Sequence, residues 1–292
     1  MGIDKNSADF MIYARAHGVD FSRAVTLGRQ GLHMRAYELR LVLERLGDSS
    51  DRDALLRFVA ESDGYADRLL ARLGATEVAS IDNSAYEGAT HVHDMNRPIP
   101  DALKQRFTAV IDGGTLEHVF DFPTAMRNAM ELLEVGGHFL GFTPANNYMG
   151  HGFYQFSPEL YFRVFSAANG FELEAMLAVE QRPGARWKRV RDPDRIKRRV
   201  TLVNRSPTLL FVMARRTELR PIFAATPQQS DFVSAWQDAG ARAAPSTRRL
   251  LKRSTWLSFL PVRIRRAIKS RISLKPRFDS RCYDDFDIDR GA

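Results

Sequence analysis

Short apolar runs alternate with amphipathic stretches over the first three quarters of the chain. The apolar runs predict strands, at 24–27, 77–82, 89–94, 107–112, 138–144, 171–180 and 207–216. Apolar residues at helical spacing predict helices, at 34–47, 51–59, 65–75, 122–137 and 157–171. Continuous apolar strands that alternate with helices are typical of a parallel sheet covered on both faces. We therefore predict an α/β fold, a three-layer doubly wound Rossmann-like sheet that is mostly parallel and has an antiparallel hairpin at its edge.

The charge distribution divides the chain into a neutral body and a basic end. The net charge of +8 arises from residues 242–277, which hold 12 Lys/Arg and no Asp/Glu. We expect residues 1–20 to be an N-terminal extension, 21–216 the Rossmann-like domain with a helical insertion at about 33–63, and 217–292 a linker and a basic amphipathic tail. A neutral body gives no electrostatic footprint for nucleic acid, so nucleic acid is not an expected partner.

Ligands of open α/β sheets bind outside the carboxyl ends of the strands, so the residues that end the strands are the first site candidates. They are Gly28, Asp82, Asp94, Asp112 and Thr143. An acid in the position of Asp82 can accept two hydrogen bonds from a ribose diol, although "DNS" is also good turn chemistry. Asp94 could accept from an adenine amino group beside the Met95 backbone, or it could be an ordinary turn residue.

The stretch 77–147, with "VASIDNSAYEGATHVHDMN", "FTAVIDGGTLEHV" and "LLEVGGHFLGFTPANN", resembles the class I S-adenosylmethionine-dependent methyltransferases. The resemblance covers roughly 24–215. It implies an enzyme that uses S-adenosylmethionine to methylate a small-molecule, glycan or lipid-precursor acceptor. Residues at the cofactor positions are Gly28, Gly31, Asp82, Asn83, Asp94, Met95, Asp112 and Gly113.

The first glycine motif departs from the pattern of this family. In "VTLGRQG", Thr26 stands at the position of an acid, and Arg29 and Gln30 stand where small residues normally leave room for the methionine part of the cofactor. Two alternatives follow from this departure. The chain could be a methyltransferase-like binding protein without activity, or an α/β enzyme that binds a nucleotide sugar.

Two histidines are the candidate catalytic residues, because a hydroxyl acceptor benefits from a general base. His118 follows the Asp112 loop and His151 lies between two glycines after the next strand. Each could instead have a structural role in its loop. Amide and phenol groups suited to a polyhydroxylated acceptor, or to satisfying the backbone of a long loop, belong to Asn146, Asn147, Tyr154 and Gln155. No cluster in the sequence has the spacing of a metal site.

Residues 242–277 combine basic side chains with Ile264, Ile268 and Ile272 on one helical face. This pattern predicts either an amphipathic helix on an anionic membrane surface, or a helix docked on the body or on a second subunit of a homo-oligomer. The single cysteine, Cys282, and the absence of a secretory signal lead us to expect a cytoplasmic protein, with the inner face of the membrane as its peripheral location.

Overall fold

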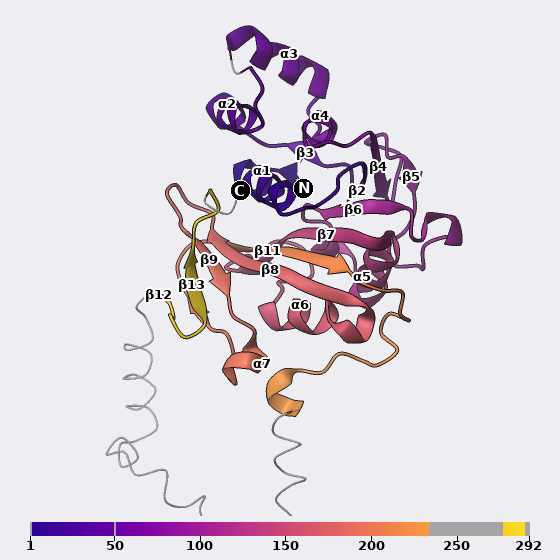
Figure 1. Cartoon of the computed structure of the whole chain (residues 1–292), viewed down its shortest axis with the longest axis vertical. Coiled ribbons are helices and arrows are strands. Elements are labelled where there is room, and N and C mark those ends of the chain that lie inside the picture. The colour runs from indigo at the N-terminus through magenta and orange to yellow at the C-terminus, as the bar shows by residue number, and fades with distance from the viewer. Residues whose placement is uncertain (1, 50, 234–276, 290–292) are drawn as a thin grey trace, which may run out of the picture.

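A computed structural model describes residues 2–49, 51–233 and 277–289, and all structural statements below concern these residues. Its main sheet has nine strands in the order β13-β9-β8-β11-β7-β6-β2-β4-β5 (Figure 1). The parallel strands are β2 (Arg23–Leu27), β4 (Glu77–Asp82), β5 (His91–Val92), β6 (Phe107–Asp112) and β7 (Leu133–Asn146). In chain order their arrangement is 3-2-1-4-5, that of a doubly wound Rossmann-like sheet, which confirms the predicted fold class.

The remaining strands of the sheet pair antiparallel. They are β11 (Thr208–Arg216), β8 (Phe171–Glu180), β9 (Trp187–Val190) and β13 (Tyr283–Phe286). Two small sheets join β1 (Gly2–Ile3) to β3 (Gly31–Leu32), and β10 (Leu202–Val203) to β12 (Arg277–Phe278). The predicted antiparallel hairpin is thus β8–β11, and β9 and β13 extend the sheet beyond it.

Helices cover both faces of the sheet and make it the middle of three layers (Figure 1). One face carries α1 (Lys5–Ala16), α2 (Ala36–Arg45), α3 (Arg52–Ser62) and α4 (Asp67–Arg72); the other carries α5 (Phe122–Glu131) and α6 (Pro158–Val164). Shorter helices are η1 (Asp101–Leu103), η2 (Leu116–His118), η3 (Ala167–Asn169) and α7 (Pro193–Ile196). Within β6, Val110 packs in one core and Ile111 in the other, which explains why this strand is buried at every position.

Both ends of the chain contribute more to the domain than the sequence predicts. In α1, Phe10 is fully buried and its ring contacts Phe142, Trp187 and Phe211, so this helix, predicted to belong to an N-terminal extension, packs into the core. Residues 283–286 return to the sheet as β13, the edge strand. Helices α2 and α3 lie where the insertion at 33–63 was predicted.

Several predicted boundaries are wrong; the helix predicted for 157–171, for example, ends at Val164. The helix predicted for 122–137 ends at Glu131, and Gly136 and Gly137 belong to β7. A side chain on Gly137 would lie 3.0 Å from the Thr108 carbonyl oxygen, so this glycine permits a close approach of β7 to β6 and is not a helix stop. The strand predicted for 89–94 shortens to His91–Val92, because β5 is an edge strand that pairs with β4 over two residues.

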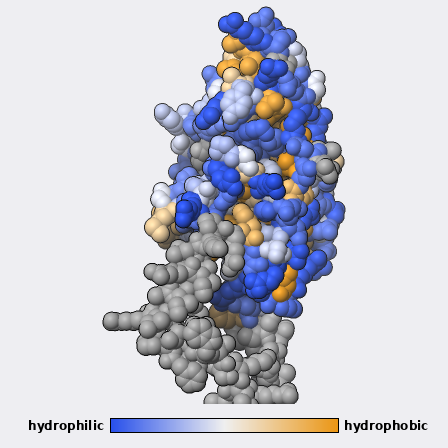
Figure 2. Space-filling view, turned by 90° about the vertical axis from the view of Figure 1, so that its left-hand side faces the viewer, coloured by the Kyte–Doolittle hydropathy of each residue, from blue (hydrophilic) through white to orange (hydrophobic). Residues whose placement is uncertain are grey.

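No helix among the described residues is long and apolar enough to cross a membrane. The predicted amphipathic segment, 242–277, lies outside the described residues except at Arg277. The face that carries β9 and β13 is mostly hydrophilic, with scattered hydrophobic residues (Figure 2).

Candidate functional site

The strand order reverses between β2 and β6, whose carboxyl ends form the expected ligand crevice of this fold. Gly28 leaves β2 with φ +68°, a conformation that favours glycine, and donates its N–H to the Ile81 carbonyl at 2.7 Å. Asp82 ends β4 beside it, half-buried, and Asp112 and Gly113 end β6. Four of the predicted cofactor positions therefore lie together at the carboxyl ends of neighbouring strands.

Gln30 fills the space between these strand ends. Its side chain is 1% exposed, its Nε2 donates to the Leu27 carbonyl at 2.5 Å, and its Oε1 lies against the face of Gly113 where a side chain would otherwise stand. Arg29, by contrast, turns outward, stacks on Tyr65 and pairs with Asp67 at 3.0 Å. Of the two large residues in the departing glycine motif, only Gln30 enters the crevice. Gly31 has a different position and pairs with Gly2 in the β1–β3 sheet.

Three buried acceptor oxygens near these strand ends have no hydrogen-bond partner in the part of the chain that the structure describes: Gln30 Oε1, Asp112 Oδ2 and Glu117 Oε2. Burial raises the pKa of Asp112 to about 8, aided by the nearby Glu117 charge, although backbone N–H groups of Thr115 and Leu116 stabilise its carboxylate. Burial likewise raises the pKa of Glu117 to about 7. A buried acceptor without a donor costs about 1–3 kcal/mol, so this end of the sheet is suited to a ligand that carries donors or positive charge.

The loop 148–154 packs on η2 and brings His151 beside Glu117. The N–H groups of Phe153 and Tyr154 both donate to the Glu117 carbonyl, at 2.7 and 3.2 Å. Gly152 permits this contact, because it has φ +69° and an added Cβ would lie 2.7 Å from the same carbonyl oxygen. As a result, His151 Nε2 lies 3.3 Å from Glu117 Oε1, and the rings of His118 and His151 are 4.9 Å apart. The two predicted catalytic histidines thus lie side by side, both exposed.

The adenine-side candidates lie further along the sheet edge. Asp94 follows β5, and its Oδ1 accepts from the N–H and side-chain amide of Asn96, a turn interaction that lowers its pKa. Met95 is buried, and its carbonyl accepts from Asn128 of α5 at 3.2 Å. Asn83 is exposed after β4.

The four predicted substrate residues all make hydrogen bonds within the protein. Asn146 and Asn147 donate to Asn204 at 2.7 and 2.8 Å, which joins the end of β7 to the loop before β11. Tyr154 donates to the Phe120 carbonyl at 2.6 Å, and Gln155 accepts from the Tyr148 N–H at 2.8 Å. Their atoms shape the loop that carries His151.

Sequence reasoning missed two residues of this site, Glu117 and Gln30. Glu117 is inside the "LEHV" motif, but only the fold reveals that its carboxylate is buried between Asp112 and His151. The signal for Gln30 was its position in the glycine motif, which predicted an obstruction but not its unpartnered oxygen.

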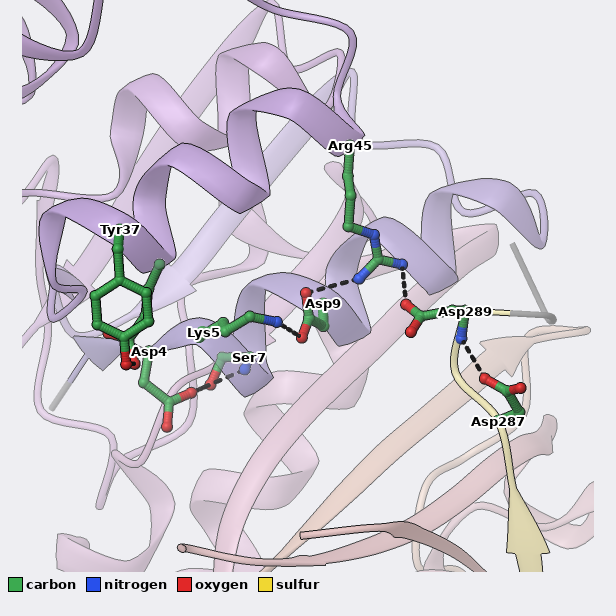
Figure 3. A network of polar contacts seen from close by, with 9 residues as sticks. Asp4, Lys5, Ser7, Asp9, Tyr37, Arg45, Asp287 and Asp289 are labelled. Carbon is green, nitrogen blue, oxygen red and sulfur yellow. Dashed lines mark hydrogen bonds and ion pairs between the residues drawn. The ribbon is translucent and has the colours of Figure 1, made fainter. Parts of the chain in front are cut away.

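A groove of about 1180 Å³ lies between α1, α2, the 181–187 turn and the segment 285–289. Lys5, Asp9 and Asp289 line this groove. They belong to a row of alternating charges (Figure 3), in which Lys5 and Arg45 both contact Asp9 and Arg45 also pairs with Asp289. This network binds the two ends of the chain to each other.

No family model and no curated protein matches this chain. Solved structures do match distantly. A Burkholderia thailandensis 1,6-didemethyltoxoflavin-N1-methyltransferase, with 1,6-didemethyltoxoflavin and S-adenosylhomocysteine bound, has 15% identity and a TM-score of 0.38 over 73% of this chain and 78% of its own. A Thermotoga maritima SAM-dependent methyltransferase has 14% identity and a TM-score of 0.34, over 73% and 91%.

A branched-chain polyamine synthase from Thermus thermophilus, solved with N4-aminopropylspermidine and 5'-methylthioadenosine, has 14% identity and a TM-score of 0.36 over 77% of this chain and 61% of its own. Scores of this size describe a distant likeness only. The fold assignment rests on the strand order and the two covered faces of the sheet.

Proposed function

We propose that this protein is an S-adenosylmethionine-dependent methyltransferase that acts on a small-molecule acceptor. The observation that carries the proposal is the set of buried, unpartnered oxygens of Gln30, Asp112 and Glu117 near the switch point of a Rossmann-like sheet. S-adenosylmethionine carries two positive groups, an ammonium and a sulfonium, and so offers what these acceptors lack. When bound, it supplies an electrophilic methyl group.

The residues of the crevice fit such a cofactor by position and chemistry. Asp82 ends the strand beside β2, where an acid accepts from a ribose diol. Gln30 and Asp112 are the residues we assign to the methionine ammonium, and Gly28 and Gly113 adjoin them at the strand ends. The exposed Asn83 and the Asp94–Met95 turn are assigned to the adenine side.

His118 and His151 are the catalytic residues we propose. They stand in adjacent loops at the rim, where the nucleophile of an acceptor must approach the cofactor, and their task is to favour loss of its proton. Burial lowers the pKa of His118, with the neighbouring His151 as a second cause, so the His118 ring is neutral at neutral pH. Asn146, Asn147, Tyr154 and Gln155 stay candidates for contacts with the acceptor. A glycan or lipid precursor is the acceptor class that the polar loop favours.

Calorimetric titration of the tag-free protein with S-adenosylmethionine and S-adenosylhomocysteine tests the proposal. We expect one site per chain, and Asp82→Ala should weaken binding about 10- to 100-fold, because hydrogen bonds to a charged group contribute about 1.5–3 kcal/mol. The exposed Asp53→Ala, on α3, is the matched control and should leave affinity unchanged. Absence of binding at millimolar ligand would refute the proposal. Unchanged binding by Asp82→Ala would refute the assignment of this crevice.

One observation favours a second candidate, a binding protein without methyltransferase activity. The side chain of Gln30 occupies the crevice where the resembling family has a small residue. In that case Gln30→Gly should create cofactor binding that the wild-type protein lacks. If the wild-type protein binds the cofactor and Gln30→Gly weakens that binding, the second candidate fails.

A further inference from the structure

Glu117, His118 and His151 bring a carboxylate and two imidazoles to one point at the rim of the crevice. One ligand atom from each residue can be chosen so that all three lie within 4.8 Å of one another. Two of the residues adjoin on η2, and the third arrives from the loop that Gly152 holds against η2. The cluster therefore depends on the tertiary fold, which is why the sequence showed no metal spacing.

The separations are close to those of a metal centre. With bond lengths of about 2.0–2.1 Å and tetrahedral geometry, two ligand atoms of Zn²⁺ lie about 3.3 Å apart. The His151 Nε2 to Glu117 Oε1 distance is 3.3 Å. Both histidines are exposed, so rotation of their rings can close the wider separation without moving the buried carboxylate.

The buried carboxyl group of the cluster has an oxygen that a cation could bind. Glu117 is 1% exposed, and its Oε2 has no hydrogen-bond partner among the described residues. Its one polar side-chain contact that the structure gives is to His151.

We infer that Glu117, His118 and His151 form a binding site for a divalent transition-metal ion, with Zn²⁺ as the representative ion. Two imidazoles and one carboxylate are a donor set that favours Zn²⁺ or Fe²⁺ over Mg²⁺ or Ca²⁺, which prefer oxygen ligands. Three protein ligands leave a coordination position open to solvent at the rim, as in catalytic rather than structural zinc sites.

The role of this ion rests on the proposed function, whereas its binding does not. An acceptor hydroxyl in the open position would have its pKa lowered by the ion, and its O–H bond would break with transfer of the proton to solvent. With the metal ion bound, His118 and His151 act on the acceptor only through the ion that they bind. Neither imidazole ring then has to take the proton of the acceptor hydroxyl.

The test is titration of Zn²⁺ into the full-length, tag-free protein after treatment with a chelator. We expect one ion per chain, and Glu117→Gln, His118→Asn and His151→Asn should each weaken binding at least about tenfold, since loss of even an outer partner of a metal site costs that much. His17→Gln, an exposed histidine on the C-cap of α1, is the matched control and should bind as the wild-type protein does. A Co²⁺-loaded sample should show the intense visible bands of a tetrahedral site, and these should disappear in His151→Asn.

Absence of stoichiometric binding, or affinity that all three variants retain, would overturn the inference. Thermal unfolding of each variant separates ligand loss from misfolding, and the exposed His118 and His151 provide variants that leave the core untouched. Titration with S-adenosylmethionine with and without chelator distinguishes the two proposals. Cofactor binding without Zn²⁺ binding would support the proposed methyltransferase and refute the metal site. Zn²⁺ binding without cofactor binding would support the metal site and refute the proposed methyltransferase.

Discussion

The contact between Gly152 and η2 gives a sharp test of how the site is assembled. Alanine at this position would retain φ near +69°, at a cost of about 1–2 kcal/mol for a residue with a Cβ. Its Cβ would also lie 2.7 Å from the Glu117 carbonyl oxygen, which is a backbone atom and cannot turn aside. The hydrogen bond from the Phe153 N–H to that oxygen must then lengthen, which adds about 1 kcal/mol.

We therefore expect Gly152→Ala to favour detachment of the loop 148–154 from η2 by about 2–3 kcal/mol. Hydrogen exchange at the Phe153 amide measures this directly, and its protection should fall about 30- to 150-fold. Zn²⁺ affinity should fall as well, because His151 would leave Glu117 while His118 stays in place.

Gly150→Ala is the control within the same loop. Gly150 has no left-handed φ, and an added Cβ would meet no atom within 4 Å. This variant should match the wild-type protein or protect the loop slightly more, because alanine lowers the entropy of the open loop. Equal loss of protection in both variants, or none in Gly152→Ala, would refute the assembly described here.

Three further outcomes follow from buried polar groups. Gln30→Ala should weaken S-adenosylmethionine binding about 10- to 100-fold in calorimetry, because the buried Oε1 would no longer accept from the cofactor; tighter binding would show that Gln30 only obstructs the crevice. Asp9→Asn should lower the free energy of unfolding by about 2–3 kcal/mol in denaturant titrations, because Arg45 and Lys5 lose a 4% exposed partner; an unchanged midpoint would contradict this. Burial lowers the pKa of His138 in the folded state below the value of about 6.5 that it has in the unfolded chain. Below about pH 6.5 the unfolded chain therefore binds the His138 proton more readily, and the free energy of unfolding should fall as the pH drops. His138→Gln should reduce that slope, and an identical slope in the variant would exclude His138 as its source.

The parts of the fold that the sequence predicts well are those determined by local pattern. Strands 77–82 and 107–112 begin and end as predicted, because each is an apolar run closed by an aspartate at the sheet edge. The end of α5 was missed because a glycine pair reads as a helix stop, whereas here Gly137 lies in a strand at close approach to β6.

The candidate site was predictable only in part, because some of its residues meet through tertiary contacts that no local pattern encodes. Strand order alone predicts that Gly28, Asp82 and Asp112 share one edge, and they do. The distance of His151 from Glu117 depends on a left-handed turn at Gly152 across 33 intervening residues, and hydrophobic periodicity carries no information about such a contact.

The chain returns to the sheet at β13, so the basic segment 242–277 is followed by a strand of the domain and is not the end of the fold. Since β11 and β13 are strands of the same sheet, the basic segment stands in the sequence between two paired parts of the chain. Truncation at residue 242 would also remove β13, uncover the edge of β9 and delete the partner of Arg45 at Asp289. Any membrane or partner contact of this segment must therefore be studied by internal replacement, which leaves the edge strand β13 and the Arg45–Asp289 ion pair in place.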